Sequence, residues 1–138
     1  MQPFHLAFPV HDLSLAKKFY TDILLCKVGR SSEEWIDFNL FGHQIVAHLD
    51  KSMDLENSLN IVDGKKVPVR HFGIVMKWNK WHQFVDYLTN ENVVFLIEPH
   101  IRFKGKPGEQ ATFFIKDPSG NALEFKSFKD KKMIFKNF

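Results

Sequence analysis

The chain has 138 residues, a single cysteine and a formal net charge of +3; the length suits one domain or two fused modules, and one cysteine excludes an internal disulfide. No run approaches the roughly 20 apolar residues of a membrane span, and no signal-like stretch opens the sequence, so we expect a cytoplasmic protein with no membrane partner. Much of the positive charge lies between Lys126 and Lys136, which we interpret as a solvated tail and not as a nucleic-acid site.

The first half of the chain predicts one helix and four strands. Residues 4–10 alternate in character, which predicts a strand with two distinct faces: Leu6, Phe8 and Val10 on one, His5, Ala7 and Pro9 on the other. Asp12 is a typical helix N-cap, and apolar residues at helical spacing predict a helix over 13–24. Strands over 26–30, 35–40 and 44–49 follow, with Phe41-Gly42-His43 as a hairpin turn.

The same order recurs after a polar linker over residues 51–66, in which Asp63-Gly64 marks a turn. We expect a strand over 67–76 with His71, Gly73 and Val75 on one face, a helix capped by Asn79, and strands over 93–98 and 111–116. Residues 99–110 form a loop between these two strands. The sequence therefore predicts an α+β fold of two tandem βαβββ modules, about 4–50 and 67–128, followed by a basic tail over 129–138.

The stretch over residues 117–128 is the most informative in the chain. Pro118 and Gly120-Asn121 favour a tight turn, and an alternating strand follows it. Leu123 and Phe125 share one face of this strand, and Ala122, Glu124 and Lys126 share the other. A buried carboxylate in mid-strand costs several kcal/mol unless a cation compensates it, so we expect a cation supplied from elsewhere in the chain.

An internal repeat relates the two halves. His5 and His71 are 66 positions apart, and each opens its module with a small residue two places on. Under this superposition His48 falls near Glu124, with a register uncertain by two residues that leaves the face unchanged. We therefore expect His5, His48, His71 and Glu124 to face one cavity.

Two imidazoles and one carboxylate around an open cavity form the ligand set of non-haem Fe(II) sites, and similar sets bind Zn, Mn, Ni or Co. A single such histidine is more often a core residue bonded to a backbone carbonyl. Three potential ligands at repeat-related positions favour a metal site.

The motifs of this chain resemble those of the vicinal oxygen chelate superfamily, which includes glyoxalase I, extradiol dioxygenases, methylmalonyl-CoA epimerase, and fosfomycin- and bleomycin-resistance proteins. The resemblance spans residues 4–128 and is carried by His5, by His71 in Arg-His-Phe-Gly-Ile-Val, and by Asp-Pro-Ser-Gly-Asn-Ala-Leu-Glu-Phe, which contains Glu124. It implies paired modules whose mixed sheets curl into a cup, and it assigns these three residues as ligands of a divalent metal: Fe(II) first, with Zn, Ni or Mn as alternatives.

Within the superfamily, the chain is most similar to small predicted extradiol-type dioxygenases that act on a small molecule with vicinal oxygens. It lacks the tyrosine that ring-cleaving members carry on the strand before the glutamate, since Thr112 and Phe114 occupy that strand. Proton-transfer members use a glutamate at the end of the first module as a fourth ligand, and His48 lies near that position. A glyoxalase- or epimerase-like isomerase or lyase and a metal-free binding protein of the bleomycin-resistance type are therefore the alternatives.

Other residues receive roles by their position. His48, if it does not bind the metal, is our candidate catalytic acid or base, and Glu109 is a second proton-transfer candidate. Arg102 and Lys104 in the predicted loop are candidates to hold an anionic group of the substrate. His11, His43, His82 and His100 are interpreted as surface residues; His100, beside the predicted loop, is the next of these to consider for the site. We also expect a homodimer with contacts through Trp78, Trp81 and the Phe-rich tail.

Overall fold

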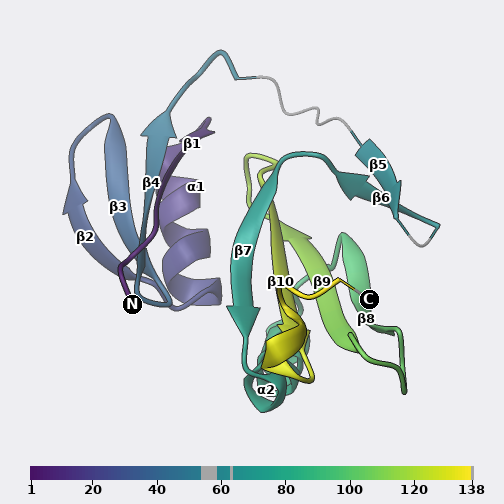
Figure 1. The fold of residues 1–138 in the computed structure, drawn as a ribbon. Helices are drawn as coiled ribbons and strands as arrows, with labels where there is room; N and C mark the ends of the chain where they lie inside the picture. Colours follow the sequence, from purple (N-terminus) through teal and green to yellow (C-terminus); the bar gives the residue numbers. More distant parts are fainter. Residues whose placement is uncertain (54–58, 63, 138) are drawn as a thin grey trace. The chain divides into compact units, whose positions relative to one another are not determined.

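The computed structural model describes residues 1–53, 59–62 and 64–137 (Figure 1). Its contacts divide the chain into two compact units, the first made of Met1–Glu56 with Asp117–Asn121 and the second of Asn57–Lys116 with Ala122–Phe138. Part of the predicted linker, residues 54–58 and 63, lies outside the described residues.

The first unit contains a four-stranded mixed sheet in the order β1-β4-β3-β2. Its elements follow the predicted βαβββ order: β1 (His5–Val10), α1 (Leu13–Lys18) continued by the π-helical turn η1 (Phe19–Ile23), β2 (Lys27–Ser31), β3 (Trp35–Leu40) and β4 (His43–Leu49). Strand β1 runs parallel to β4, and the other neighbours are antiparallel.

The predicted local signals hold in this unit. The Asp12 carboxylate caps α1 by accepting a hydrogen bond of 2.9 Å from the Leu15 amide, which satisfies one of the free N–H groups of the first turn. The Tyr20 ring packs against Phe8 and Phe38 at centroid distances of 5.4 and 5.0 Å. The Phe8 face of β1 is therefore the core face, and the His5 face is opposite to it.

The second unit repeats the arrangement, with a sheet in the order β7-β10-β9-β8. Its elements are β5 (Leu59–Val62), β6 (Lys65–Pro68), β7 (His71–Met76), α2 (Trp78–Asn90), β8 (Ile97–Arg102), β9 (Gln110–Lys116), β10 (Ala122–Phe128) and the 3₁₀ turn η2 (Lys131–Met133). The two sheets have the same order when β1 is matched with β7 and β4 with β10, which confirms the internal repeat. The hairpin β5–β6 is an addition to it.

Two strands of this unit differ from their predicted ranges. The single strand expected over 67–76 is divided into β6 and β7, which are separated by a bend at Val69 and Arg70. Strand β8 begins at Ile97 instead of residue 93 and runs through Pro99 into the predicted loop. Proline is tolerated there because β8 is an edge strand of the sheet, where a missing N–H need not break a ladder.

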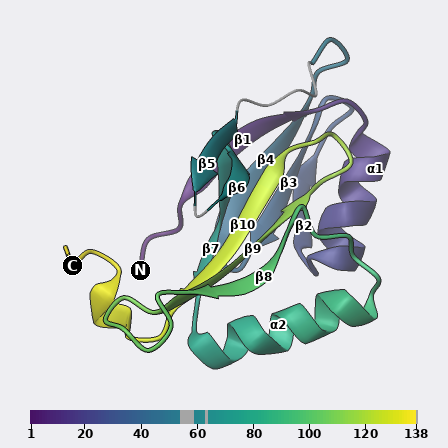
Figure 2. The same cartoon turned by 90° about the vertical axis from the view of Figure 1, so that its right-hand side faces the viewer.

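The predicted N-cap of α2 is wrong. The cap residue is Lys77, without a side-chain hydrogen bond, and Asn79 lies inside the first turn. The apolar face of α2 is as predicted and covers one face of the second sheet (Figure 2). The packing of its apolar face therefore stabilises this helix, without a side-chain cap at its N-terminus.

Trp81 belongs to this core and not to the surface. Its side chain is buried, its indole Nε1 donates a hydrogen bond of 2.8 Å to the Phe125 carbonyl oxygen, and its ring lies 5.7 Å from that of Phe113. The homodimer stays a prediction, but Trp81 is not available for its contact. No helix in the described ranges is both long and apolar enough for a membrane crossing.

Candidate metal and substrate site

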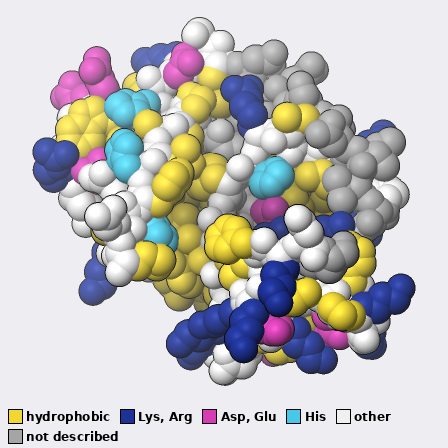
Figure 3. Space-filling view, viewed as in Figure 1, with side chains coloured by type: hydrophobic (Ala, Val, Ile, Leu, Met, Phe, Trp, Pro, Cys, Tyr) yellow, Lys and Arg dark blue, Asp and Glu magenta, His cyan; other side chains and the backbone are white. Residues whose placement is uncertain are grey.

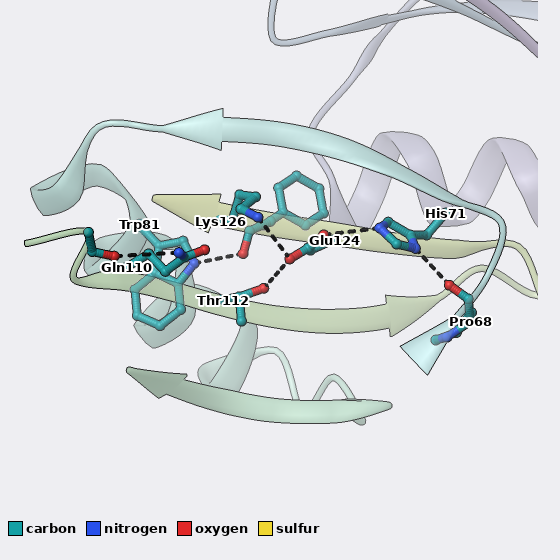
Figure 4. Close-up of polar contacts among 9 residues, drawn as sticks. Pro68, His71, Trp81, Gln110, Thr112, Glu124 and Lys126 are labelled. Atoms are coloured by element: carbon teal, nitrogen blue, oxygen red, sulfur yellow. Dashed lines mark hydrogen bonds and ion pairs between the residues drawn. The ribbon is translucent and has the colours of Figure 1, made fainter. Parts of the chain in front are cut away.

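Strand β10 separates its side chains as predicted. Phe125 packs against Phe84 of α2 with a centroid distance of 5.1 Å, so the odd-numbered residues face the helix. Glu124 lies on the opposite face, between Gly73 of β7 and Phe114 of β9 in the strand register (Figure 4). The candidate site of the second unit is therefore the face of the sheet that α2 leaves uncovered.

His71 and Glu124 meet on this face. The distance between His71 Nε2 and Glu124 Oε2 is 3.1 Å, and His71 Nδ1 lies 2.7 Å from the Pro68 carbonyl oxygen. A carbonyl oxygen can only accept, so Nδ1 carries a proton and Nε2 is the atom directed at the carboxylate. The Phe114 ring packs edge-on at 5.0 Å and restricts the imidazole plane.

The other oxygen of Glu124 has its own partners. Oε1 accepts a hydrogen bond of 2.7 Å from the Thr112 hydroxyl, and Lys126 Nζ lies 3.8 Å from it. Lys126 and, when protonated, His71 are thus the cations that the sequence required for this carboxylate. Thr112 lies on β9, the strand on which the resemblance to ring-cleaving dioxygenases would place a tyrosine.

The electrostatics of the metal-free pair favour both charges. Burial works to raise the pKa of Glu124, but hydrogen bonds from His71 and Thr112 and the charge of Lys126 outweigh it and bring the pKa below its ordinary value. The hydrogen bond to Glu124 raises the pKa of His71, against a smaller opposing effect of burial. In the absence of a metal, each side chain therefore stabilises the charged form of the other.

A pocket of about 160 Å³ opens on this face, wholly within the second unit. Its lining combines the pair with basic, polar and apolar side chains: Lys65, Val67, His71, Ile97, His100, Arg102, Thr112, Phe114, Glu124 and Lys126.

Arg102 lines this pocket as predicted, whereas Lys104 is an exposed loop residue outside it. His100 was interpreted as a surface residue, but it lines the pocket opposite Thr112 in the register of β8 and β9. Its Nδ1 lies 2.9 Å from the Glu98 carbonyl oxygen, so Nδ1 donates and Nε2 is the ring atom left for other chemistry.

Three polar pocket residues received no role in the site from the sequence. Lys126 was predicted on the same strand face as Glu124, but it was counted with the solvated tail. Lys65 was assigned to the linker, although the turn predicted at Asp63-Gly64 comes just before it. Thr112 was noted only as a replacement for tyrosine.

The first unit holds His5 in a comparable way. His5 Nδ1 lies 2.8 Å from Gln44 Oε1, the Gln44 amide nitrogen donates to Asp37 Oδ2 at 3.4 Å, and Arg30 Nε donates to the same oxygen at 3.4 Å. Because the amide nitrogen faces a carboxylate, the amide oxygen faces His5 and can only accept from it. His5 therefore also donates through Nδ1, which makes Nε2 the candidate ligand atom.

The register of the first sheet corrects the position of His48. Glu124 pairs with Gly73, and the repeat-equivalent residue of Gly73 is Ala7, which pairs with Val46. Val46, a buried residue, is thus the counterpart of Glu124. His48, exposed on the same face, is the counterpart of Lys126. The observed register removes the two-residue uncertainty. The position equivalent to Glu124, where a fourth ligand was considered, is occupied by Val46 and not by His48.

Glu109 has a structural environment. It is buried, its Oε1 accepts a hydrogen bond of 2.7 Å from the Gly105 amide, and its Oε2 lies 3.1 Å from Lys129 Nζ. The bond from Gly105 lowers the pKa of Glu109. It does not line the pocket, so its predicted proton-transfer role stays without structural support.

Basic side chains gather on the surface around the C-terminal segment (Figure 3).

The paired atoms fit a bound divalent ion. Two neighbouring ligands at about 2.1 Å from a metal, at a right angle, are roughly 3 Å apart, close to the 3.1 Å between His71 Nε2 and Glu124 Oε2. Within either unit, the described residues include no group of three His, Cys, Asp or Glu side chains suited to share one ion. His5 lies in the other unit, and its place as the third ligand stays a prediction.

Comparison with known proteins agrees with the repeat and the motifs. The sequence profile of the Glyoxalase/Bleomycin resistance protein/Dioxygenase superfamily matches residues 2–125. A crystal structure of a glyoxalase/bleomycin resistance protein/dioxygenase from Alicyclobacillus acidocaldarius is 36% identical, with a TM-score of 0.83 over 97% of this chain and 96% of that chain. The comparison with curated proteins gave no match.

More distant structures share the fold alone. A fosfomycin resistance protein from Listeria monocytogenes is 15% identical, with a TM-score of 0.68 over 96% of this chain and 97% of that chain. A glyoxalase/dioxygenase from Nostoc punctiforme is 14% identical, with a TM-score of 0.67 over 94% of this chain and 92% of that chain. The profile match over most of the sequence shows that the chain belongs to the glyoxalase/bleomycin resistance protein/dioxygenase superfamily.

Proposed function

We propose that this protein is a metal-dependent enzyme in which His5, His71 and Glu124 hold one divalent ion, and that it is an extradiol-type dioxygenase for a small substrate with two adjacent oxygens. One observation carries the metal assignment. In both repeat-related histidines, Nδ1 donates to an oxygen acceptor, Gln44 Oε1 or the Pro68 carbonyl. This is the usual state of a metal-binding imidazole, with Nε2 as the ligand atom.

The choice of reaction class is supported by Val46. An isomerase of the glyoxalase I type is expected to use a carboxylate at the end of the first module as a fourth ligand. The register places apolar, buried Val46 at the repeat-equivalent position. Three protein ligands leave room for both substrate oxygens and O₂. When bound, Fe(II) would supply Lewis acidity and electrons for O₂.

The remaining residues prepare the site. The Thr112 hydroxyl donates a hydrogen bond to Glu124 Oε1 and thereby orients Oε2 toward His71. Phe114 and Ile97 form an apolar part of the pocket wall, which strengthens electrostatic interactions between the neighbouring polar groups. His100 Nε2 and, as predicted from the sequence, the His48 imidazole are the candidates to exchange a proton with the substrate.

Metal analysis tests the first part of this proposal. Protein purified without chelator or added metal should contain about one equivalent of ion per chain, and His5→Ala, His71→Ala and Glu124→Ala should each lose it. His82→Ala, a change of the same type on the exposed side of α2, should retain it. Unchanged metal content in the Glu124 variant would remove the basis of the assignment.

An oxygen electrode tests the second part. Fe(II)-loaded protein should consume O₂ with a member of a catechol panel. Flat traces across the panel, together with turnover of hemithioacetals by the Ni- or Zn-loaded protein, would favour the isomerase.

A metal-free binding protein is the second candidate, and one observation favours it. Lys126 and protonated His71 together compensate the charge of Glu124, so the site is electrostatically satisfied without an ion. Wild-type protein that stays metal-free after incubation with Fe(II), Zn, Ni and Mn, yet binds a small molecule, would establish this alternative.

A further inference from the structure

We propose that the pocket of the second unit recognises a tetrahedral dianionic group of the phosphate or phosphonate type on the substrate. Three basic side chains line the pocket, Lys65, Arg102 and Lys126, against the single carboxylate of Glu124. The lining is therefore net positive whatever the charge of its histidines, and a bound divalent ion would increase that charge. This inference rests on the proposed function only in taking the bound group to be part of the substrate.

The cations come from three different strands, β6, β8 and β10. Strands β8 and β10 flank β9 in one sheet, and β6 belongs to the hairpin β5–β6. A planar carboxylate offers two oxygens, whereas a phosphoryl or phosphonyl group offers three and carries up to two charges. The number of cationic donors thus matches the tetrahedral group better.

Lys126 retains donors for such a ligand. Its Nζ lies 3.8 Å from Glu124 Oε1, which is too long for a hydrogen bond, and the Thr112 hydroxyl already bonds that oxygen at 2.7 Å. The ammonium lies beside the carboxylate and 5.5 Å from the centre of the Phe128 ring, and neither of these contacts is a hydrogen bond. Arg102 adds a planar fork, and such forks bind phosphate by paired hydrogen bonds.

The pocket is small and partly apolar. Its volume of about 160 Å³ is well below the roughly 300–1,000 Å³ of sites for drug-sized ligands. Val67, Ile97 and Phe114 form part of the wall, and their low polarity strengthens the attraction between the cations and an anion. A compact charged group fits these conditions.

Titration calorimetry on metal-free wild-type protein tests the inference. The probes are inorganic phosphate, methylphosphonate and acetate at equal ionic strength. Both tetrahedral anions should bind at least about tenfold more tightly than acetate. Equal affinity for acetate would overturn the assignment, and binding of inorganic phosphate without methylphosphonate would show a free-phosphate site and overturn the role in substrate recognition.

Variants locate the binding. Arg102→Gln and Lys126→Gln should each weaken methylphosphonate binding by about 10- to 100-fold, the usual effect of losing a charge-assisted hydrogen bond. Arg102→Lys should have an intermediate effect because it keeps the charge and loses the fork. Lys132→Gln, which removes the same charge from an exposed position outside the pocket, should leave the affinity unchanged. An equal loss in the Lys132 variant would show that only net charge matters and would overturn the proposal.

The two proposals can fail separately. Stoichiometric metal in the wild-type protein without binding of either tetrahedral anion removes this inference and leaves the enzyme proposal intact. Anion binding by a protein that takes up no metal supports the pocket assignment and removes the metal-dependent enzyme.

Discussion

Gly73 lies beside Glu124 on the neighbouring parallel strand, and a Cβ atom at Gly73 would overlap the Glu124 backbone carbonyl. The close approach of β7 and β10 at this point therefore requires glycine. It also sets the position of the carboxylate relative to His71, which lies two residues earlier on β7.

Gly73→Ala should consequently destabilise the protein by at least about 2 kcal/mol, because backbone cannot move aside as a flexible side chain does. Urea denaturation measures this change. Gly29→Ala on β2 is the control, since a Cβ there would lie 3.3 Å from the Asp37 Cβ and 3.8 Å from the Asp37 backbone oxygen, without the overlap found at Gly73. Equal stability of the Gly73 variant and wild type would show that the two strands can separate without cost.

Gln44 is predicted to position His5 for metal binding. Gln44→Leu removes the acceptor of the 2.8 Å bond to His5 Nδ1, so the ring is free to rotate and to change tautomer. Loss of such a partner lowers metal affinity by roughly 10- to 100-fold. Equilibrium dialysis with Zn measures it, and Gln83→Leu on the exposed side of α2 is the matched control. If Gln44→Leu binds Zn with unchanged affinity while His5→Ala binds none, the His5 ring does not need the hydrogen bond to Gln44 to bind the metal.

The ion pair of His71 and Glu124 predicts a pH dependence in the metal-free protein. The raised pKa of His71 stabilises the fold fully below its ordinary value of 6.5, and this stabilisation is lost as pH rises through the folded-state value. The lowered pKa of Glu124 stabilises the fold above 4.5, and this is lost as pH falls through its folded-state value. The contribution of the pair should be largest between about pH 4.5 and 6.5.

NMR titration of the chelator-treated protein measures the His71 value directly. In Glu124→Gln the pKa of His71 should fall, because the hydrogen bond that raises it loses its charged acceptor. His82 offers an internal reference in the same spectra. A His71 pKa unaffected by this substitution would mean that the two side chains do not interact in solution.

Tyr20 and Asp117 form a buried contact in the first unit, and it predicts a stability effect. The Tyr20 hydroxyl donates a hydrogen bond of 2.8 Å to Asp117 Oδ2, and Asn121 donates to the same carboxylate. Tyr20→Phe leaves Asp117 buried with one donor fewer, which costs about 1–3 kcal/mol. Urea denaturation measures this change. A denaturation midpoint of Tyr20→Phe equal to that of the wild type would contradict the role assigned to this bond.

The repeat and the faces of the strands could be predicted because both depend on local pattern. Alternation assigns Phe8 and His5 to opposite faces whatever the precise strand ends are, and the histidines with their small neighbours relate the two modules. For the same reason the sequence could not place His48: a slip of two residues preserves every face and changes only the partner.

The composition of the pocket could not be predicted because it depends on pairing between distant segments. Lys65 reaches the pocket through a hairpin of which the sequence predicted only the turn at Asp63-Gly64 and not the two strands. His100 reaches it through an edge strand that contains Pro99, a residue that normally argues against a strand. The sequence contained these residues, but only tertiary pairing brings them beside Glu124.

The last prediction concerns the group that transfers a proton during turnover. His100 lines the pocket with Nδ1 bound to the Glu98 carbonyl oxygen, so its Nε2 can serve the substrate. His48, the candidate from the sequence, lies on β4 of the first unit and is exposed. A general acid or base contributes about 10²- to 10⁴-fold to the rate. His100→Gln should therefore lower kcat by about 100-fold or more, abolish one limb of the pH profile of kcat, and leave the iron content close to that of wild type. His48→Ala measured in parallel separates the two candidates. If that variant loses the limb while His100→Gln keeps it, the proton is transferred by the first module, and His100 only shapes the pocket.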